Sequence, residues 1–74
     1  MAGLPAVSGA KVVKALERAG FTLARVSGSH HVLRHPDGRA VVVPVHPGQD
    51  IAKGTLRSIL KLVDITPDDL RNLL

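Results

Sequence analysis

The four histidines are the side chains in this sequence best suited to acid–base chemistry, and all of them lie between residues 30 and 46. Imidazole has an ordinary pKa close to neutral pH, so it can accept or donate a proton under physiological conditions. His30 and His31 are adjacent in a segment typical of a β-strand, and alternation along a strand sends them to opposite faces. At most one of them can therefore share a surface with a given site.

A predicted hairpin sets the positions of the histidines relative to one another. The Asp-Gly pair at residues 37–38 is a strong signal for a two-residue turn between extended segments. With this turn, His30 pairs with Val45 and lies beside His46, whereas His35 lies at the other end of the hairpin. We therefore expect His35 to be separate from any site that the other three histidines form.

Most other kinds of catalytic site lack the residues that they need. The chain has no cysteine, and no Asp or Glu is adjacent to a histidine, so we expect no metal and no cofactor. Ser29 and His30 are neighbours on a strand and point apart, which does not form a catalytic triad. RNA cleavage requires the fewest catalytic residues from the protein, because the 2′-hydroxyl of the substrate is the nucleophile and a single histidine can act as general acid or base.

Charge and aromatic content narrow the class of partner. The formal net charge is +4, and it is uneven: residues 1–61 hold nine basic and three acidic side chains, whereas residues 62–74 hold one basic and three acidic. A basic body favours a polyanion or an acidic protein. Phe21 is the only aromatic residue of the Phe, Trp and Tyr types. RNA readers that stack bases on aromatic side chains are therefore excluded, and contacts to the RNA backbone and 2′-hydroxyls are expected.

Hydrophobic periodicity predicts three helices and three strands. Apolar residues spaced by three and four predict a helix between Ser8, its expected N-cap, and Gly20, its expected terminator. A second amphipathic helix begins at Lys53, and Thr66 followed by Pro67 predicts the start of a short third helix. Extended runs predict three antiparallel strands, at residues 21–27, 30–35 and 39–45.

This order predicts an α+β fold in which helices cover one face of a three-stranded antiparallel sheet. The order α-β-β-β-α-α is also that of double-stranded-RNA-binding domains, which bind RNA by shape and by contacts to phosphates and 2′-hydroxyls. A chain of 74 residues accommodates one domain, residues 1–74. It has no run of 18 apolar residues and no targeting segment, so no membrane association is expected, and the lack of cysteine is compatible with the cytoplasm.

The sequence also contains three motifs in a fixed order. They are Gly28-Ser29-His30-His31, Val43-Pro44-Val45-His46 and, at residues 53–60, Lys-Gly-Thr-Leu-Arg-Ser-Ile-Leu. Together they resemble the HicA toxin family of bacterial toxin–antitoxin modules. The pairs Ser8-Gly9 and Gly20-Phe21, the latter preceded by Glu-Arg-Ala, extend the resemblance over nearly the whole chain.

The resemblance implies a fold like that of double-stranded-RNA-binding domains and a ribosome-independent mRNA interferase that arrests translation. It implies a HicB-type antitoxin that covers the active surface, so the chain would be a monomer when free and part of a hetero-oligomer with the antitoxin. The family's catalytic histidine follows Gly-Ser and corresponds to His30. We expect His30 to act as general acid or base in a metal-independent 2′-O-transphosphorylation that leaves a 2′,3′-cyclic phosphate.

Further RNA contacts are expected from Arg25, Ser29, His31, Lys53 and Arg57. His46 either assists His30 or holds its own loop by a hydrogen bond, and Lys53 either contacts a phosphate or is simply solvated. Two rivals to the nuclease remain open. One is a non-catalytic RNA-binding module of the same fold, and the other is an interaction domain with no affinity for RNA.

Overall fold

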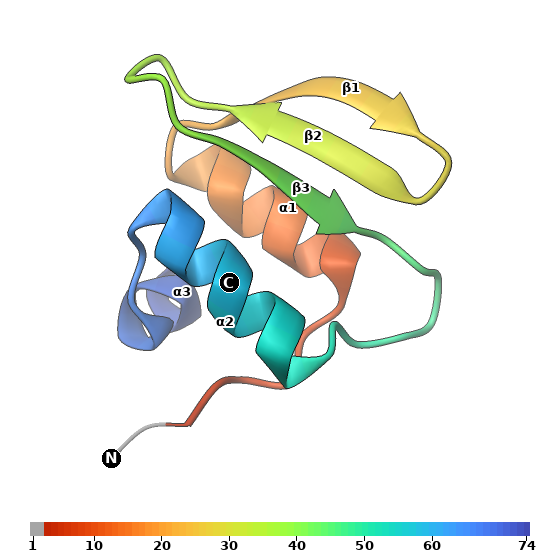
Figure 1. Ribbon diagram of the computed structural model, residues 1–74. Helices are drawn as coiled ribbons and strands as arrows, with labels where there is room; N and C mark the ends of the chain where they lie inside the picture. The colour runs from red at the N-terminus through yellow and green to blue at the C-terminus, as the bar shows by residue number, and fades with distance from the viewer. Residues whose placement is uncertain (1–2) are drawn as a thin grey trace.

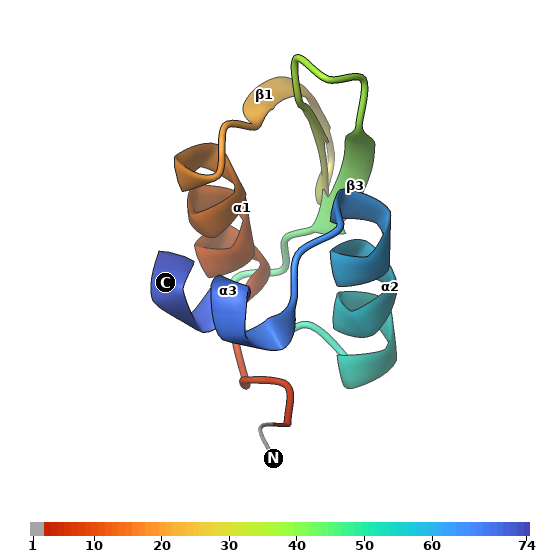
Figure 2. The same ribbon diagram turned by 90° about the vertical axis from the view of Figure 1, so that its left-hand side faces the viewer.

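The computed structural model describes residues 3–74 of the 74-residue chain. Its elements are helix α1 (Gly9–Arg18), strands β1 (Thr22–Ser27), β2 (His30–Arg34) and β3 (Ala40–Pro44), and helices α2 (Lys53–Val63) and α3 (Pro67–Leu73). The strands form one antiparallel sheet in the order β1-β2-β3. The helices lie on one side of this sheet (Figures 1 and 2). The predicted α+β fold, with the element order of a double-stranded-RNA-binding domain, is therefore confirmed.

Helix α1 begins and ends where the sequence predicts. Ser8 has an extended backbone, and its hydroxyl oxygen accepts a hydrogen bond from the amide of Lys11 at 3.3 Å. This bond satisfies one of the amides that the first turn leaves without a partner. Gly20, two residues after the helix, has the left-handed backbone expected of a terminator.

The two C-terminal helices start differently. In α3, Thr66 Oγ1 accepts a hydrogen bond from the amide of Asp69 at 3.1 Å, and Pro67 occupies the first helical position, both as predicted. Helix α2 starts at Lys53 as predicted, but Ala52 stands at its N-cap and makes no side-chain hydrogen bond there. The first amides of α2 are thus left for solvent or a ligand. No helix within residues 3–74 has the length and hydrophobicity to cross a bilayer.

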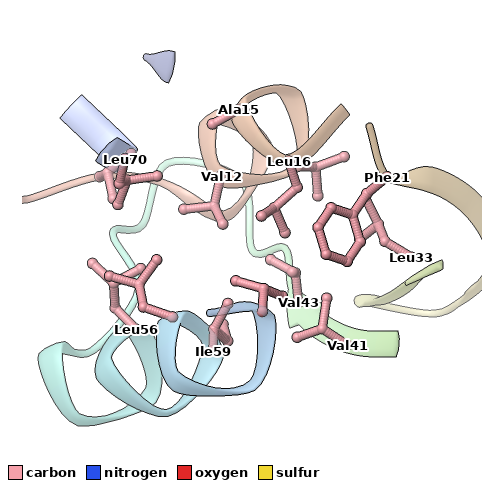
Figure 3. Close-up of a cluster of buried hydrophobic side chains, with 14 residues drawn as sticks. Val12, Ala15, Leu16, Phe21, Leu33, Val41, Val43, Leu56, Ile59 and Leu70 are labelled. Carbon is pink, nitrogen blue, oxygen red and sulfur yellow. The ribbon is translucent and has the colours of Figure 1, made fainter. Parts of the chain in front are cut away.

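A single hydrophobic core joins the two layers (Figure 3). It brings together Val12 and Leu16 of α1, Leu33 and Val43 of the sheet, and Leu56 of α2, and each of these side chains is 0% exposed. Complete burial of each such side chain contributes about 1.5–3 kcal/mol to folding. The core thereby fixes which face of the sheet meets the helices and which face is turned away.

The register of the sheet defines this second surface, which we call the open face. Leu33 and its partner Val41 are buried, so the residues that alternate with them point away from the helices. A shift in register between Leu23 and Arg25 leaves Ala24 as an extra residue in β1. The open face consists of Thr22, Arg25, Ser27, His30, Val32, Arg34, Ala40, Val42 and Pro44.

The predicted two-residue turn between β2 and β3 is wrong. The loop has three residues, 36–38, closed by hydrogen bonds from the His35 amide to the Arg39 carbonyl at 2.8 Å and from the Gly38 amide to the His35 carbonyl at 2.9 Å. A two-residue turn at Asp-Gly requires a positive φ at both residues, but here only Gly38 has one, at +99°. The partner of His30 is therefore Pro44 and not Val45.

The hairpin end far from His30 is held to the helices by a polar and aromatic cluster. The His35 ring packs edge-on against Phe21 with 5.0 Å between centroids, and the Arg39 guanidinium lies 5.1 Å from the centre of the same Phe21 ring. Arg39 also donates hydrogen bonds to the Asp37 carboxylate, at 2.8 Å, and to the carbonyl of Val63 at the end of α2. His35 is thus structural and separate from the other histidines, as predicted.

Strand β1 is the least covered element of the fold. All six of its residues are exposed, including Leu23 and Val26 on the side that faces the helices. In Figure 1 this strand extends beyond α1, with its outer edge unpaired. The sheet therefore overhangs the helical layer at β1.

Candidate active site on the open face of the sheet

His30 is held at the start of β2 by a tight turn. Ser27 pairs with His30, so Gly28 and Ser29 are the two central residues of the turn between β1 and β2. Gly28 has a φ of +58°, as the first central residue of a type II′ turn requires. His30 follows directly, is exposed, and projects from the open face between Ser27 and Pro44 of the neighbouring strands.

His31 lies on the opposite face, as predicted from strand alternation. It is half-buried, and its Nδ1 lies 3.4 Å from the carbonyl oxygen of Ser29. It lines a groove under the overhanging sheet together with Lys14, Glu17 and Leu23. The structure therefore does not bring His31, a predicted RNA contact, onto the surface that carries His30.

His46 lies beyond the end of β3, in the loop that leads to α2. It lines a shallow pocket with Pro44, Asp50 and Thr55, at the first turn of α2. The Val45 amide donates a 2.7 Å hydrogen bond to the Ser29 carbonyl, which joins this loop to the turn before His30. His46 and His30 thus lie at the same end of the sheet. They are not side by side as the predicted register implied, because His30 pairs with Pro44 and not with Val45.

Ser29 and Arg25 lie near His30 in different ways. Ser29 is the residue directly before it, and its carbonyl oxygen is the group that holds Val45. Arg25 projects from the open face of β1, one row along the sheet from the Ser27–His30 pair. Of the predicted RNA contacts, Arg25 is therefore the cationic one that shares a face with His30.

Lys53 and Arg57 belong to the helical layer. Lys53 is the exposed first residue of α2, at the positive end of the helix dipole. Arg57 lies one turn further along and borders a groove with Leu4 and Pro67, on the side of α2 next to the N-terminal segment. The sheet separates Arg57 from the open face, so the structure does not bring it to His30.

Arg34 is a functional candidate that the sequence reasoning missed. It is exposed on the open face of β2, four residues after His30, and borders a shallow pocket with Ala24, Arg25 and Val32. The alternation of His30, Val32 and Arg34 along one strand was the available signal, because residues two apart share a face.

Carboxylates are absent from the open face of the sheet. Glu17 lies under the sheet in the His31 groove, and Asp50 lies in the pocket with His46. Asp37 is at the far end of the hairpin, where a hydrogen bond from the Arg39 amide at 3.0 Å and the Arg39 guanidinium lower the pKa of its carboxyl below the ordinary value of 3.8. Between residues 3 and 74, no three His, Asp or Glu side chains cluster as a metal site would require. The open face thus offers one imidazole and two guanidinium groups, a combination suited to a phosphodiester.

The chain is similar over most of its length to one family of known proteins. Residues 9–65 of the chain match the family model described as HicA toxin of bacterial toxin-antitoxin. The match includes α1, the whole sheet with His30, and α2. No curated protein matches the chain closely enough to be counted as a relative. Because the family model covers well over half of its length, the chain belongs to the HicA toxin family of bacterial toxin–antitoxin systems.

Proposed function

We propose that this toxin is an endoribonuclease that cleaves mRNA without a ribosome or a metal ion and so arrests translation. The observation that carries the proposal is the placement of His30: an exposed imidazole after a Gly-Ser turn, on a sheet face that holds two arginines and no carboxylate. Such a face attracts the RNA backbone, and the imidazole is free to exchange a proton with it. The absence of stacking aromatics fits a nuclease that holds RNA by phosphates and 2′-hydroxyls.

The reaction is an intramolecular transphosphorylation. The 2′-oxygen attacks the adjacent phosphorus, the bond to the 5′-oxygen of the next nucleotide breaks, and the products are a 2′,3′-cyclic phosphate and a free 5′-hydroxyl. His30 acts either as the base that removes the 2′-proton or as the acid that protonates the leaving 5′-oxygen. Arg25, on the same face, binds the RNA backbone beside the reacting phosphate. His46, from the same end of the sheet, is the candidate for an assisting role.

Cleavage of purified RNA in the presence of EDTA tests this proposal. We expect the wild-type protein to produce fragments ending in 2′,3′-cyclic phosphate, and His30→Ala to lose at least 100-fold in rate because general acid–base catalysis is worth roughly 10²–10⁴-fold. His31→Ala is the matched control, since it removes the neighbouring imidazole from the opposite face. Equal loss in both variants would contradict the assignment of His30, and RNA binding without cleavage would favour a non-catalytic module.

The proposed partner is a HicB-type antitoxin, since toxins of this family act in toxin–antitoxin modules. We propose that the antitoxin covers His30 and places carboxylates against the arginines of the open face. The free toxin is then a monomer in the cytoplasm, where its mRNA substrate lies, and the inhibited form is a hetero-oligomer. Co-expression with the protein encoded next to this gene, followed by light scattering and a cleavage assay of the complex, tests the partner and the inhibition.

A further inference from the structure

Two arginines on the open face are not used by the fold. Arg25 and Arg34 are exposed and border one shallow pocket, and neither guanidinium has a hydrogen bond or ion pair to another side chain or carbonyl within residues 3–74. Other arginines are engaged: Arg18 donates to the carbonyl of Leu73 at 2.6 Å, and Arg39 binds Asp37. Two unengaged arginines from adjacent strands bring their charges together with no acidic residue on that face.

The register places this pair at a defined distance from His30. Arg25 is opposite Val32, and Arg34 follows Val32 by two residues on the same face. At about 3.3 Å per residue along a strand, the α-carbons of His30 and Val32 lie roughly 7 Å apart, and those of His30 and Arg34 roughly 13 Å apart. These separations correspond to one and two steps between successive phosphates of an extended nucleic-acid strand.

The floor of this region suits a sugar–phosphate backbone. Val32 and the neighbouring Val42, which is 48% exposed, provide an apolar surface between His30 and the arginines. Guanidinium groups bind phosphate oxygens through pairs of parallel hydrogen bonds, and two of them on one pocket can hold a single phosphate from both sides. The surface therefore combines one cationic pocket, an apolar strip and one imidazole in line along β2.

We propose that the pocket between Arg25 and Arg34 is a subsite for a backbone phosphate of the RNA, one or two nucleotides away from the bond cleaved at His30. The RNA strand then runs along β2 across the open face of the sheet. This inference rests on the proposed ribonuclease function and adds a new residue, Arg34, which acts on the substrate at a distance from the reacting atoms. It follows that a substrate must extend beyond the scissile phosphate to use this subsite.

Substrates of different length test the subsite. A dinucleoside monophosphate contains only the scissile phosphate, whereas a tetranucleotide supplies flanking phosphates. We expect Arg34→Gln to lower kcat/KM for the tetranucleotide by roughly 10- to 100-fold, the value of a charge-assisted hydrogen-bond pair, and to leave the dinucleoside rate unchanged. Lys61→Gln, which removes one positive charge from the exposed surface of α2, is the control and should change neither rate.

A chemical change in the RNA provides the reciprocal test. Replacing a single flanking phosphate of the tetranucleotide by a neutral methylphosphonate should slow the wild-type protein as much as Arg34→Gln does. The same replacement should then cause no further loss in Arg34→Gln, because the charge is already without its partner. Equal loss on the dinucleoside and the tetranucleotide, or no loss on either, would overturn the proposal.

Binding measurements separate this inference from the proposed reaction. A 2′-O-methyl tetranucleotide cannot be cleaved by attack of its 2′-oxygen, so its affinity is independent of catalysis. We expect Arg34→Gln to weaken its binding about tenfold and to reduce the slope of log affinity against log salt by about one. If the wild type does not cleave RNA but Arg34→Gln still weakens binding of this tetranucleotide, the proposed ribonuclease reaction is contradicted and the phosphate subsite is supported. If Arg34→Gln weakens only the complex with the antitoxin, the pocket binds protein carboxylates and the subsite is wrong.

Discussion

A Cβ atom added to Gly9 would lie 2.1 Å from the carbonyl oxygen of Pro44 and 2.9 Å from the α-carbon of Val45. The first turn of α1 is therefore in direct backbone contact with the end of β3. Pro44 is the sheet partner of His30, so this contact is made directly beside the strand position that carries the imidazole. The glycine in the Ser-Gly pair thus supports the site from the opposite layer of the fold.

We expect Gly9→Ala to lower the free energy of unfolding by about 1–3 kcal/mol, because backbone atoms on both sides must move apart. RNA cleavage should fall further than the loss of folded protein explains, since Pro44 shifts with its partner His30. Gly54→Ala is the matched control in α2, where an added Cβ meets nothing within 4 Å. Chemical denaturation and cleavage assays of both variants check this, and similar behaviour of the two would contradict it.

The turn before His30 should be sensitive to the handedness of residue 28. Gly28→Ala introduces an L-side chain at a φ of +58°, which costs roughly 1–2 kcal/mol although the surrounding space is open. A chain of 74 residues can be synthesised chemically, so D-alanine can be placed at the same position. D-alanine prefers positive φ, and we expect it to restore both stability and cleavage. If D-alanine restores neither stability nor cleavage, the size of the added methyl group, and not the backbone conformation, explains the loss in both variants.

Arg39 should be important for stability but not for the reaction. It covers Phe21, binds Asp37 and donates to the carbonyl of Val63, all at the hairpin end far from His30. We expect Arg39→Lys to lower the free energy of unfolding by about 1–3 kcal/mol, since an ammonium cannot make the same planar contacts. At a temperature where the variant is folded, its cleavage rate should equal that of the wild type. A selective loss of activity would show that this end of the hairpin reaches the substrate.

Acid should weaken the fold partly through Asp37. The pKa of its carboxyl is lowered in the folded protein, so the stabilisation is present above the ordinary carboxyl value of 3.8 and is lost as the pH falls through the lower folded value. The groups facing it are Arg39 and the ring of His35, whose Nδ1 lies 3.1 Å from an Asp37 carboxylate oxygen.

Denaturation of the wild type and Asp37→Asn between pH 6 and pH 2 measures this contribution. Asparagine keeps an oxygen acceptor for the Arg39 amide but does not titrate. We expect the difference in stability between the two proteins to be constant at the upper end and to shrink below the ordinary carboxyl pKa. Because the pair is exposed, added salt should reduce the difference. A difference that is independent of pH would contradict the role of the Asp37 charge.

The element order was predictable from the sequence because local signals and hydrophobic spacing agree. Ser8 and Thr66 cap their helices through their own hydroxyl groups, and this chemistry is local. The opposite orientation of His30 and His31 follows from strand alternation alone. The motif around His30, taken together with the two later motifs, then indicated the family without the structure.

The register of the second hairpin was not predictable in the same way. The pair Asp37-Gly38 fits either a two-residue turn or the last part of a three-residue loop, and the choice depends on tertiary contacts. Here Arg39 holds Asp37 while it covers Phe21, and this favours a negative φ at Asp37. The one-residue difference moved the expected partner of His30 from Val45 to Pro44.

The set of residues that make up the open face also could not be predicted without the structure. One added residue in a strand reverses the side on which the following side chains lie. The sequence could therefore place Arg25 on the same face as His30 only if the extra residue in β1 was already known. Lys53 and Arg57 belong to one of the motifs, but both lie on α2 in the helical layer and not on the open face. Proximity in a motif therefore did not translate into proximity at the site.

The exposed strand β1 has a further consequence for motion. Both β1 and β3 are edge strands, but β3 buries two of its side chains and β1 buries none, so we expect β1 to open at lower free energy than β2 or β3. Amide hydrogen exchange should therefore be fastest in the sheet along Thr22–Ser27. Because Ser27 leads directly into the turn that holds His30, we expect transient fraying of this edge to loosen the end of the sheet that carries His30 while the core remains intact. RNA bound across Arg25 and Arg34, as proposed above, should slow that exchange.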